Sequence, residues 1–319
     1  MNYIVNSKND GMTRRLRFLM SALAVGFFML GLFSCKQWTF EGEQTVPSYI
    51  RIDSITLNAD YFTYGEATHN IVDAWVYLDD QVVGGFELPA VIPVLKQGVH
   101  KLTIYAGIKV NGISASRAPY PFFQPLIINE FNLVPDSIVT INPVVSYYDP
   151  NTITMRWMED FENATLSIEP TAASDTGIVR VVDPEALISQ YSSYSGSVVL
   201  PHNKAFTLVN SQELTDLPGL GTPVMLEMDY NCTDTFLVGM VYRQNNVITE
   251  LPLVHVNPTD FDNDPPARWN KIYINLGPNV TDNPHADYFK VYFARKNDRT
   301  GRTEKYYFDN IKLIYRNRI

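Results

Sequence analysis

Alternation of apolar and polar residues is the feature that most constrains how this 319-residue chain can fold. In His100–Val110 every second side chain is apolar, and Tyr49–Leu57 alternates with one shift at Ser54, which is the period of a strand that buries one face of a sheet. Short turns interrupt the pattern. An Asp79-Asp80-Gln81 turn follows one strand, and Asn111-Gly112 follows another, two residue types that tolerate positive φ. We therefore expect an all-β protein.

The strand pattern divides into two units. Residues 48–148 contain six or seven short strands and no convincing helix, which predicts an immunoglobulin-like β-sandwich. The boundary falls near Asp149-Pro150-Asn151, and residues 149–319 form the second unit. Its one helix signal is Asp183–Gln190, where Asp183 is a suitable N-cap and Pro184 suits the first helical position.

Strands with longer connections account for the rest of the second unit. The predicted strands are Ser197–Leu200, Phe206–Asn210, Val224–Tyr230, Thr235–Tyr242, Lys271–Leu276, Phe289–Ala294 and Tyr306–Tyr315.

Composition excludes several classes of protein. The apolar fraction of 45% is enough to build cores, so the chain is not globally disordered. Acidic residues outnumber basic ones by 34 to 25, whereas a nucleic-acid binder normally carries a basic surface. Two cysteines are too few for a disulfide framework. We expect no nucleic-acid partner.

The N-terminus predicts export. Arg14, Arg15 and Arg17 precede an apolar run over residues 18–33, which is shorter than the ~20 residues that a membrane-spanning helix needs. Leu32-Phe33-Ser34-Cys35 resembles a bacterial lipobox, which implies an N-terminal diacylglycerol and acyl lipid on Cys35. The alternatives are an ordinary signal peptide and an uncleaved anchor.

On the lipoprotein interpretation, residues 1–34 are a signal peptide whose natural start is Met12, and residues 35–47 are a lipidated tether. The expected location is the outer membrane, held by the lipid anchor, with either face of that membrane possible.

No catalytic motif is found. The five histidines are scattered, and Cys232 has no histidine adjacent in sequence. Glu227 and Asp229 share a strand face, but no further acid follows them as a glycosidase site would require. Asp260–Asp264 begins like a calcium loop and fails at Pro265. We expect a protein that is not an enzyme.

The second unit resembles the β-jelly-roll family of carbohydrate-binding and galactose-binding-like modules. The resemblance rests on Met158–Asn163 at its start, Arg268–Leu276 within it and Tyr306–Tyr315 at its end. It implies that the first and last strands pair. It also implies a structural calcium ion (Ca2+) near those strands, with Glu162 and Asp309 as candidate ligands. The alternative is two acids that accept hydrogen bonds from backbone amides in turns.

Aromatic residues supply the candidate binding surfaces. Sugars are usually gripped by aromatic faces, and four aromatic residues lie on or beside predicted strands of the second unit; they are Trp269, Tyr273, Tyr288 and Tyr292. The proline-rich stretch Arg117–Pro125 brings together Tyr120, Phe122 and Phe123, a candidate protein contact. For the four aromatic residues of the second unit, the alternative is ordinary core packing. For the proline-rich stretch, the alternative is packing against the second unit.

The first unit resembles a group of envelope lipoproteins of diderm bacteria, through Trp75–Pro89 and Gly107–Pro121. The resemblance implies a setting in outer-membrane protein assembly or glycan uptake. Our leading hypothesis is a non-catalytic, lipid-anchored binding or scaffold subunit with an outer-membrane protein partner. The alternative is a glycan-binding surface lipoprotein.

Overall fold

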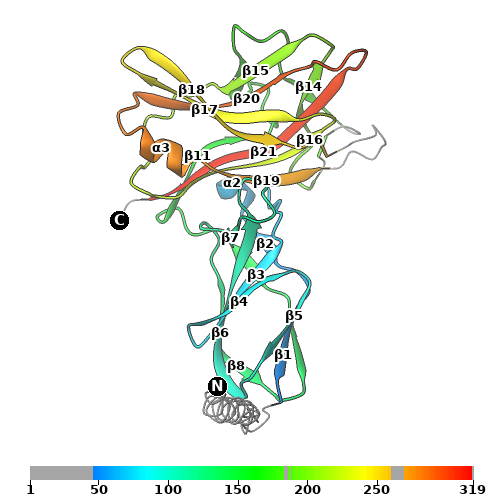
Figure 1. Cartoon of the computed structure of the whole chain (residues 1–319), viewed down its shortest axis with the longest axis vertical. Helices are drawn as coiled ribbons and strands as arrows, with labels where there is room; N and C mark the ends of the chain where they lie inside the picture. Colours follow the sequence, from blue (N-terminus) through cyan, green and yellow to red (C-terminus); the bar gives the residue numbers. More distant parts are fainter. Residues whose placement is uncertain (1–45, 183–185, 188, 260–268, 318–319) are drawn as a thin grey trace, which may run out of the picture. The chain divides into compact units, whose positions relative to one another are not determined.

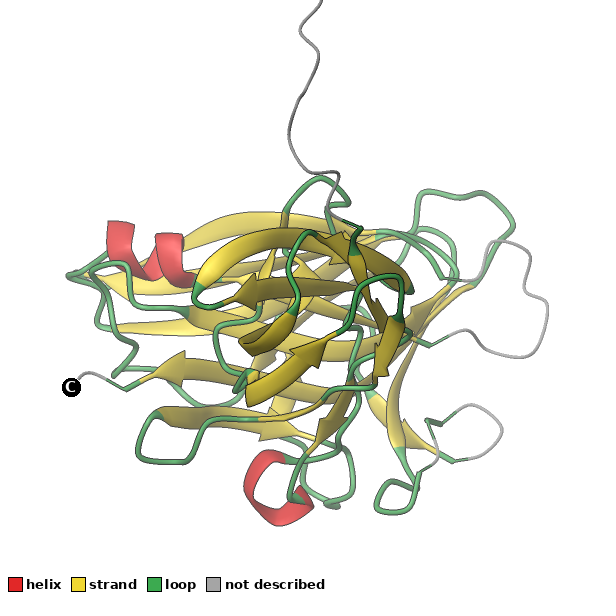
Figure 2. Cartoon of the chain, turned by 90° about the horizontal axis from the view of Figure 1, so that it is seen from below, coloured by secondary structure: helices red, strands yellow, loops and turns green. Residues whose placement is uncertain are grey.

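The computed structural model describes residues 46–182, 186–187, 189–259 and 269–317. Strands make up most of the regular structure of these residues, which confirms the predicted all-β class, and the helices among them are short (Figure 2). The predicted signal peptide and Cys35 lie outside the described residues. Within the described part of the chain, no helix has the length and apolar character needed to cross a membrane.

Residues 48–146 form the N-terminal sandwich (Figure 1). Its strands are β1 (Ser48–Ile52), β2 (Thr56–Asn58), β3 (Asp73–Leu78), β4 (Gln81–Glu87), β5 (Ala90–Val94), β6 (Gly98–Lys109), β7 (Arg117–Pro119), β8 (Leu126–Leu133), β9 (Ile138–Ile141) and β10 (Val144–Ser146), with the single-turn helix α2 (Tyr61–Tyr64) after β2. The β4-β3-β6-β7 sheet, joined by β8, shares one buried core with the β5-β1-β9 sheet.

Turn residues set the hairpins of this sandwich. Asp79 and Asp80 both have positive φ and join β3 to β4, as their sequence predicted. Asn111 and Gly112 also have positive φ, but the loop that they begin runs on to β7. Strands β9 and β10 are separated at Pro143, which has no backbone N–H to donate.

Residues 153–316 form the C-terminal sandwich, a jelly roll of two sheets, as predicted. The β21 sheet has the order β13-β14-β21-β16-β19, with β11 also paired to β21. Its strands are β11 (Ile153–Glu159), β13 (Val179–Val181), β14 (Ser195–Leu200), β16 (Val224–Cys232), β19 (Asn270–Asn275) and β21 (Glu304–Arg316). The β20 sheet has the order β12-β15-β20-β17-β18. Its strands are β12 (Ile168–Pro170), β15 (Ala205–Asn210), β17 (Phe236–Gln244), β18 (Val247–Val256) and β20 (Tyr288–Lys296).

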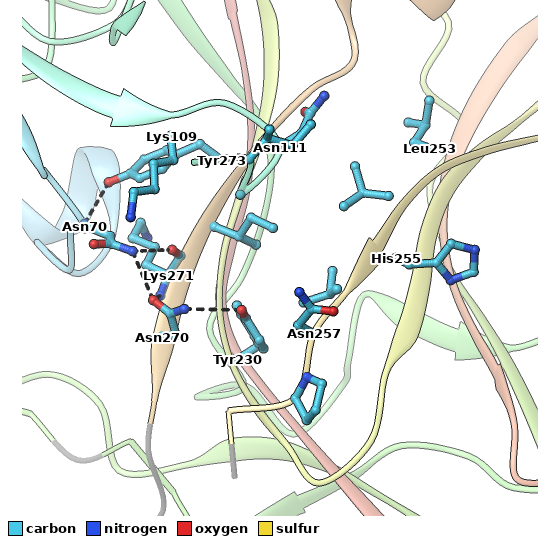
Figure 3. Close-up of a pocket in the computed structure, with 16 residues that line it drawn as sticks. Asn70, Lys109, Asn111, Tyr230, Leu253, His255, Asn257, Asn270, Lys271 and Tyr273 are labelled. Atoms are coloured by element: carbon cyan, nitrogen blue, oxygen red, sulfur yellow. Dashed lines mark hydrogen bonds between the residues drawn. The ribbon is translucent and has the colours of Figure 1, made fainter. Parts of the chain in front are cut away.

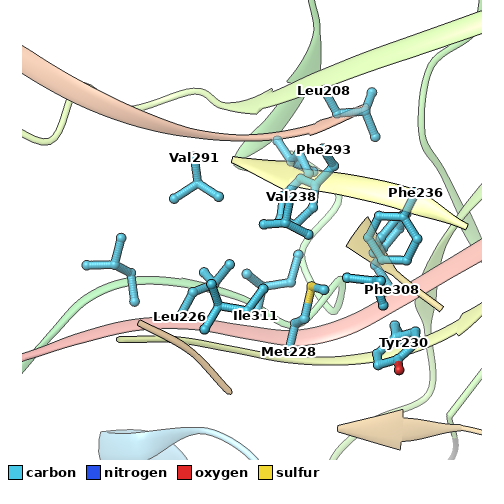
Figure 4. Close-up of a cluster of buried hydrophobic side chains, with 14 of the residues drawn as sticks. Leu208, Leu226, Met228, Tyr230, Phe236, Val238, Val291, Phe293, Phe308 and Ile311 are labelled. Carbon is cyan, nitrogen blue, oxygen red and sulfur yellow. The ribbon is translucent and has the colours of Figure 1, made fainter. Parts of the chain in front are cut away.

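The core of the jelly roll lies between these two sheets. Figure 4 shows Leu226 and Met228 of β16 facing Val238 and Phe293 of the opposite sheet. All four side chains are fully buried. The first strand, β11, pairs antiparallel with the last, β21, as the family resemblance implied.

Each predicted strand of the second unit is present, but the prediction did not include β11, β12, β13 or β18. The longest of these is β18. It pairs with β17 through a turn in which Asn245 and Asn246 both have positive φ. Pro252 within β18 weakened the sequence signal. The strand tolerates this proline because it lies at the edge of its sheet.

The helix predicted at Asp183–Gln190 falls partly on residues outside the described structure, and the described ones are not helical. The backbone N–H of Leu187 donates to Ser195 Oγ at 2.8 Å, and Ser189 Oγ accepts from the backbone N–H of Ser192 at 3.0 Å. Serine side chains therefore satisfy backbone groups that a helix would have paired internally.

The two sandwiches belong to one compact unit that begins at Val46. Among the described strands, no sheet takes members from both sandwiches, although Val110 makes a parallel bridge to Tyr273 of β19. The division of the chain into two domains near residue 149 stays a prediction. Helix α3 (Gly277–Asp282) follows β19.

Candidate functional site

Four buried charges lie on the face of the β21 sheet opposite the jelly-roll core. Glu227 and Asp229 come from β16, Lys271 from β19 and Lys312 from β21. Each is at most 5% exposed. Lys271 Nζ lies 3.3 Å from Glu227 Oε2 and 3.7 Å from Asp229 Oδ1. We call these four residues the ionic network. Their formal charges cancel, which reduces the cost of burying them.

The N-terminal sandwich supplies hydrogen-bond donors to this network. Tyr120 Oη donates to Glu227 Oε1 at 2.5 Å, and Tyr147 Oη donates to Glu227 Oε2 at 2.9 Å. Burial raises the pKa of both tyrosines well above the usual value, and the Glu227 carboxylate beside them raises the pKa further. Both hydroxyls therefore remain protonated donors at physiological pH.

Residues 61–70, which we call the strap, cross the charged face of the β21 sheet. Lys312 Nζ donates to the backbone oxygen of Glu66 at 2.6 Å. Thr68 Oγ1 lies 2.5 Å from Asp229 Oδ2 and accepts from Lys271 Nζ at 3.0 Å. Beyond these, Tyr273 Oη accepts from the backbone N–H of Asn70 at 3.0 Å. Hydrogen bonds to Lys312, Asp229 and Lys271 of the ionic network thus hold the strap on the charged face of the sheet.

An open groove of about 570 Å³ lies where the strap ends, between the two sandwiches (Figure 3). It takes Asn70, Lys109 and Asn111 from the N-terminal sandwich. The turn residues Gly112 and Ile113, which follow Asn111, also line the groove. The remaining described lining residues belong to the C-terminal sandwich, and they are Tyr230, Leu253, Val254, His255, Val256, Asn257, Pro258, Asn270, Lys271, Ile272 and Tyr273. No carboxylate occurs among these described lining residues.

Hydrogen bonds hold the groove side chains in place while leaving some groups unused. Asn70 Nδ2 donates to Asn270 Oδ1 at 2.9 Å, and Asn270 Nδ2 donates to Tyr230 Oη at 3.2 Å, both drawn in Figure 3. Asn111 Oδ1 accepts from the backbone N–H of Asn275 at 2.8 Å. The exposed Asn257 amide has no side-chain partner among the described residues, so it is free for a ligand.

The four aromatic residues predicted as a sugar platform do not form one surface. Tyr273 is 1% exposed and its hydroxyl binds the strap, while Tyr292 is 3% exposed on the other sheet. Trp269 is half-buried against Tyr307, with ring centroids 6.4 Å apart. Tyr288 is half-buried on β20. Only Tyr273 lines the groove.

The proline-rich aromatic stretch is buried rather than exposed. Tyr120, Phe122 and Phe123 are at most 2% exposed, and the Tyr120 ring packs 4.9 Å from that of Tyr273. Tyr120 therefore packs against the second unit, which was the alternative considered from the sequence, while Phe122 and Phe123 pack against the Tyr120 ring. Their burial leaves these three residues no exposed face for another protein.

The two candidate calcium ligands accept hydrogen bonds from different residues of the segment 192–195. Glu162 Oε1 accepts from the backbone amides of Ser193 and Tyr194 at 2.7 and 2.8 Å, as the alternative to a calcium site described. Asp309 Oδ2 accepts from Ser195 Oγ at 2.6 Å, and burial raises the pKa of Asp309 to about 8. The described residues contain no group of three or more histidine, cysteine or acidic side chains arranged for a metal. A calcium ion at this position stays a prediction.

Two other candidates from the sequence, Cys232 and the pair Glu227 and Asp229, are buried in the structure. Cys232 is buried, and this burial raises the pKa of its thiol to about 12, so the thiolate is scarce at neutral pH. Glu227 and Asp229 do share a face, but that face is covered by the strap and by Tyr120 and Tyr147.

The polar groove residues were missed by sequence reasoning. Asn70 and Asn257 follow strand patterns with no motif of their own, and their sequence separation conceals that they line one groove. Asn111 was noted for its turn alone. The only available signal was the concentration of asparagine in predicted loops, which is also the ordinary composition of turns.

The comparisons with known proteins concern fold. No protein-family model matches the sequence. No curated protein matches it either. Among solved structures, the chain is similar to the CBM22-1–GH10 modules of a Clostridium thermocellum endo-1,4-β-D-xylanase complexed with xylohexaose, at 13% identity and a TM-score of 0.35, over 51% of this chain and 28% of that one.

Two further similarities are to carbohydrate-binding modules alone. A C-terminal family 22 module of Clostridium thermocellum matches at 13% identity and a TM-score of 0.36, over 54% of this chain and 99% of the module. A promiscuous carbohydrate-binding module of the β-sandwich superfamily matches at 12% identity and a TM-score of 0.34, over 76% of this chain and 85% of the other.

Removing the Lys271 ammonium should destabilise the protein strongly. Lys271→Met leaves the buried Glu227 and Asp229 carboxylates without their shared cation, and breaking a buried ion pair from one side costs about 3–5 kcal/mol. Urea unfolding measures this loss. The control is Lys296→Met, because the Lys296 side chain is 66% exposed and its substitution should change stability by less than about 0.5 kcal/mol. Equal losses for the two variants would contradict the role given to the network.

Stability should depend on Lys312 above pH 8. Burial lowers the pKa of Lys312 to about 8 in the folded protein, from its usual 10.5. Between these values the unfolded chain holds the proton and the folded chain does not, so the unfolding free energy rises with pH, by at most about 1.4 kcal/mol per unit. Lys312→Met should remove this rise. Urea unfolding of the wild type and of Lys312→Met at pH 7 to 10.5 tests this prediction. If the difference in unfolding free energy between the two proteins stays constant over this range, the prediction is refuted.

Proposed function

We propose that this protein is a glycan-binding protein and that the groove between its two sandwiches is the binding site. The observation that carries the proposal is the lining of that groove, where four asparagines, two tyrosines and two lysines surround about 570 Å³. This volume is large enough for several sugar units in an extended chain rather than for a single ion.

The chemistry of the lining suits sugars. Each sugar hydroxyl both donates and accepts hydrogen bonds, and each asparagine amide offers two donors and an acceptor. Asn257 presents its amide without a side-chain partner among the described residues, and Asn70 and Asn270 are held in position by bonds to one another. Preorganised polar groups of this kind lower the cost of ordering on binding.

Binding without catalysis is part of the proposal. A glycoside hydrolase needs two carboxyl groups that flank the scissile bond. The described lining of the groove contains no carboxyl group, and Glu227 and Asp229 are enclosed by the strap and the ionic network. These features support a binding role. The outer-membrane location and the lipid on Cys35, predicted from the N-terminal sequence, complete the proposal of a surface glycan-binding lipoprotein.

Substitutions in the groove should weaken glycan binding without unfolding the protein. Asn257→Ala removes a neutral hydrogen-bonding group, worth about 0.5–1.5 kcal/mol, and Lys109→Ala removes a charged one, worth about 1.5–3 kcal/mol. We therefore expect roughly 2- to 12-fold weaker binding for Asn257→Ala and a loss of about tenfold or more for Lys109→Ala. Calorimetric titration of the full chain with xylohexaose, a mannan hexamer and a uronic-acid hexamer measures the change.

Matched controls lie outside the groove. Asn132→Ala removes an exposed asparagine from β8, and Lys296→Ala removes an exposed lysine from β20. Neither control should change the affinity. The proposal fails if wild-type protein binds none of the three hexamers, or if Asn257→Ala and Lys109→Ala both bind as the wild type does.

A scaffold role in an outer-membrane complex is the second candidate. The observation that favours it is a set of exposed aliphatic side chains near Val46, where the described chain begins. Leu95 is 69% exposed, Val99 64% and Ile138 59%. The strand pairing places them at one end of the N-terminal sandwich, since Ser48 pairs with Val94 and Tyr49 with Ile138.

A mild-detergent pulldown tests this second candidate. The scaffold role predicts recovery of an outer-membrane barrel protein in a fixed ratio, and loss of that protein when Leu95 and Val99 are both replaced by serine. The matched control replaces the exposed Val247 and Ile248 of β18 by serine. Recovery of the protein alone would contradict the scaffold role and leave glycan binding as the function.

A further inference from the structure

Three aromatic rings form an exposed cluster at the other end of the strap from the groove. The Tyr61 and Tyr191 rings are stacked, with centroids 4.7 Å apart and planes 15° apart, and the Phe62 ring meets Tyr61 edge-on at 5.5 Å. Phe62 is 86% exposed and Tyr191 46%. A phenylalanine as exposed as Phe62 buries little apolar area and so contributes little to folding.

A cavity of about 170 Å³ lies beside this cluster. The described lining comprises Tyr61, Phe62, Gly65, Met158, Glu159, Asp160, Asn310, Ile311 and Lys312. Asn310 is 2% exposed, and its Oδ1 has no hydrogen-bond partner among the described residues. A buried acceptor without a partner costs about 1–3 kcal/mol, so a ligand that donates to it recovers that energy.

Local contacts hold the cluster rigid. Asp60 caps the single turn of α2, labelled in Figure 1, by accepting from the backbone N–H of Thr63 at 3.0 Å. Tyr61 Oη donates to Asp160 Oδ2 at 2.9 Å, which ties the turn to the jelly roll. Gly65 has a φ of 70°, and a Cβ there would lie 3.1 Å from Lys312 Cε, so glycine is required beside the cavity.

The charges at the cavity indicate the character of the ligand. Two acids, Glu159 and Asp160, line it together with Lys312, so a charged ligand of either sign meets a like charge as well as an opposite one. An apolar peptide side chain would leave Asn310 Oδ1 without a partner. A neutral ligand with one apolar face and several hydroxyl groups satisfies both the exposed ring and the buried acceptor.

We propose that the Tyr61–Phe62–Tyr191 cluster and its cavity form a binding site for a single neutral pyranose ring, separate from the groove. The apolar face of the sugar stacks on Phe62, and a hydroxyl donates to Asn310 Oδ1. This site rests on its own observations. It stands whether or not the groove binds an oligosaccharide.

Ligand-observed NMR titration of the full chain with methyl β-D-glucopyranoside, methyl β-D-galactopyranoside and methyl α-D-mannopyranoside tests the site. At least one glycoside should bind. Phe62→Ala should weaken its binding about tenfold, because the stacking surface is lost. Phe62→Tyr, which keeps an aromatic face, should bind within about twofold of the wild type.

The control variants separate this site from the groove. Leu220→Ala removes an equally exposed apolar side chain, at 88% exposure, and should leave glycoside binding unchanged. Asn257→Ala should also leave glycoside binding unchanged, while Phe62→Ala should leave hexamer binding in the groove unchanged. The proposal is overturned if the wild type binds no glycoside or if Phe62→Ala binds as tightly. Self-association that Phe62→Ala abolishes, without glycoside binding, would also overturn it and assign the cluster to protein contact.

Discussion

The ionic network on the β21 sheet is the interaction on which the arrangement of this protein depends. Taking four charges out of water costs several kcal/mol for each ion, and the cost is recovered only when the charges are paired and their remaining hydrogen-bonding capacity is used. The jelly roll supplies the charges. The covering residues supply the partners, through Tyr120, Tyr147, Thr68 and the backbone of Glu66. Neither half satisfies its buried polar groups without the other. The hydrogen bonds between the two sandwiches therefore favour one particular arrangement of the contact.

The strands were predictable because their information is local. Alternation over five to nine residues and turn residues with positive φ identified the β3–β4 hairpin and most strands of the jelly roll. Failures arose where a local signal was ambiguous. Pro252 concealed an edge strand, and serine side chains replaced helical hydrogen bonds near Leu187. In both cases the deciding partner is distant in sequence or lies in another strand.

The candidate site was not predictable, because its contacts join residues far apart in the chain. Thr68 and Asp229 are separated by 161 positions, and Glu66 and Lys312 by 246. From the sequence, alternation in β16 places Glu227 and Asp229 on the face away from the core, where acids are normally solvated. Nothing local indicates that this face is covered, nor that Lys271 and Tyr120 meet the same carboxylate. Pattern analysis found the strand face, and only tertiary structure gives its environment.

The strap changes which part of the chain a binding function belongs to. Because residues 61–70 cover the charged face of the β21 sheet, a ligand has access only where the strap leaves it, at the groove and at the aromatic cluster. Asn70 lines one opening, and Tyr61 and Phe62 line the other, so both are built partly from the N-terminal sandwich. A jelly roll with the same strands and no strap would present a different face, lined by charges. Ligand preference in this chain therefore follows from ten residues outside the jelly roll as much as from the fold itself.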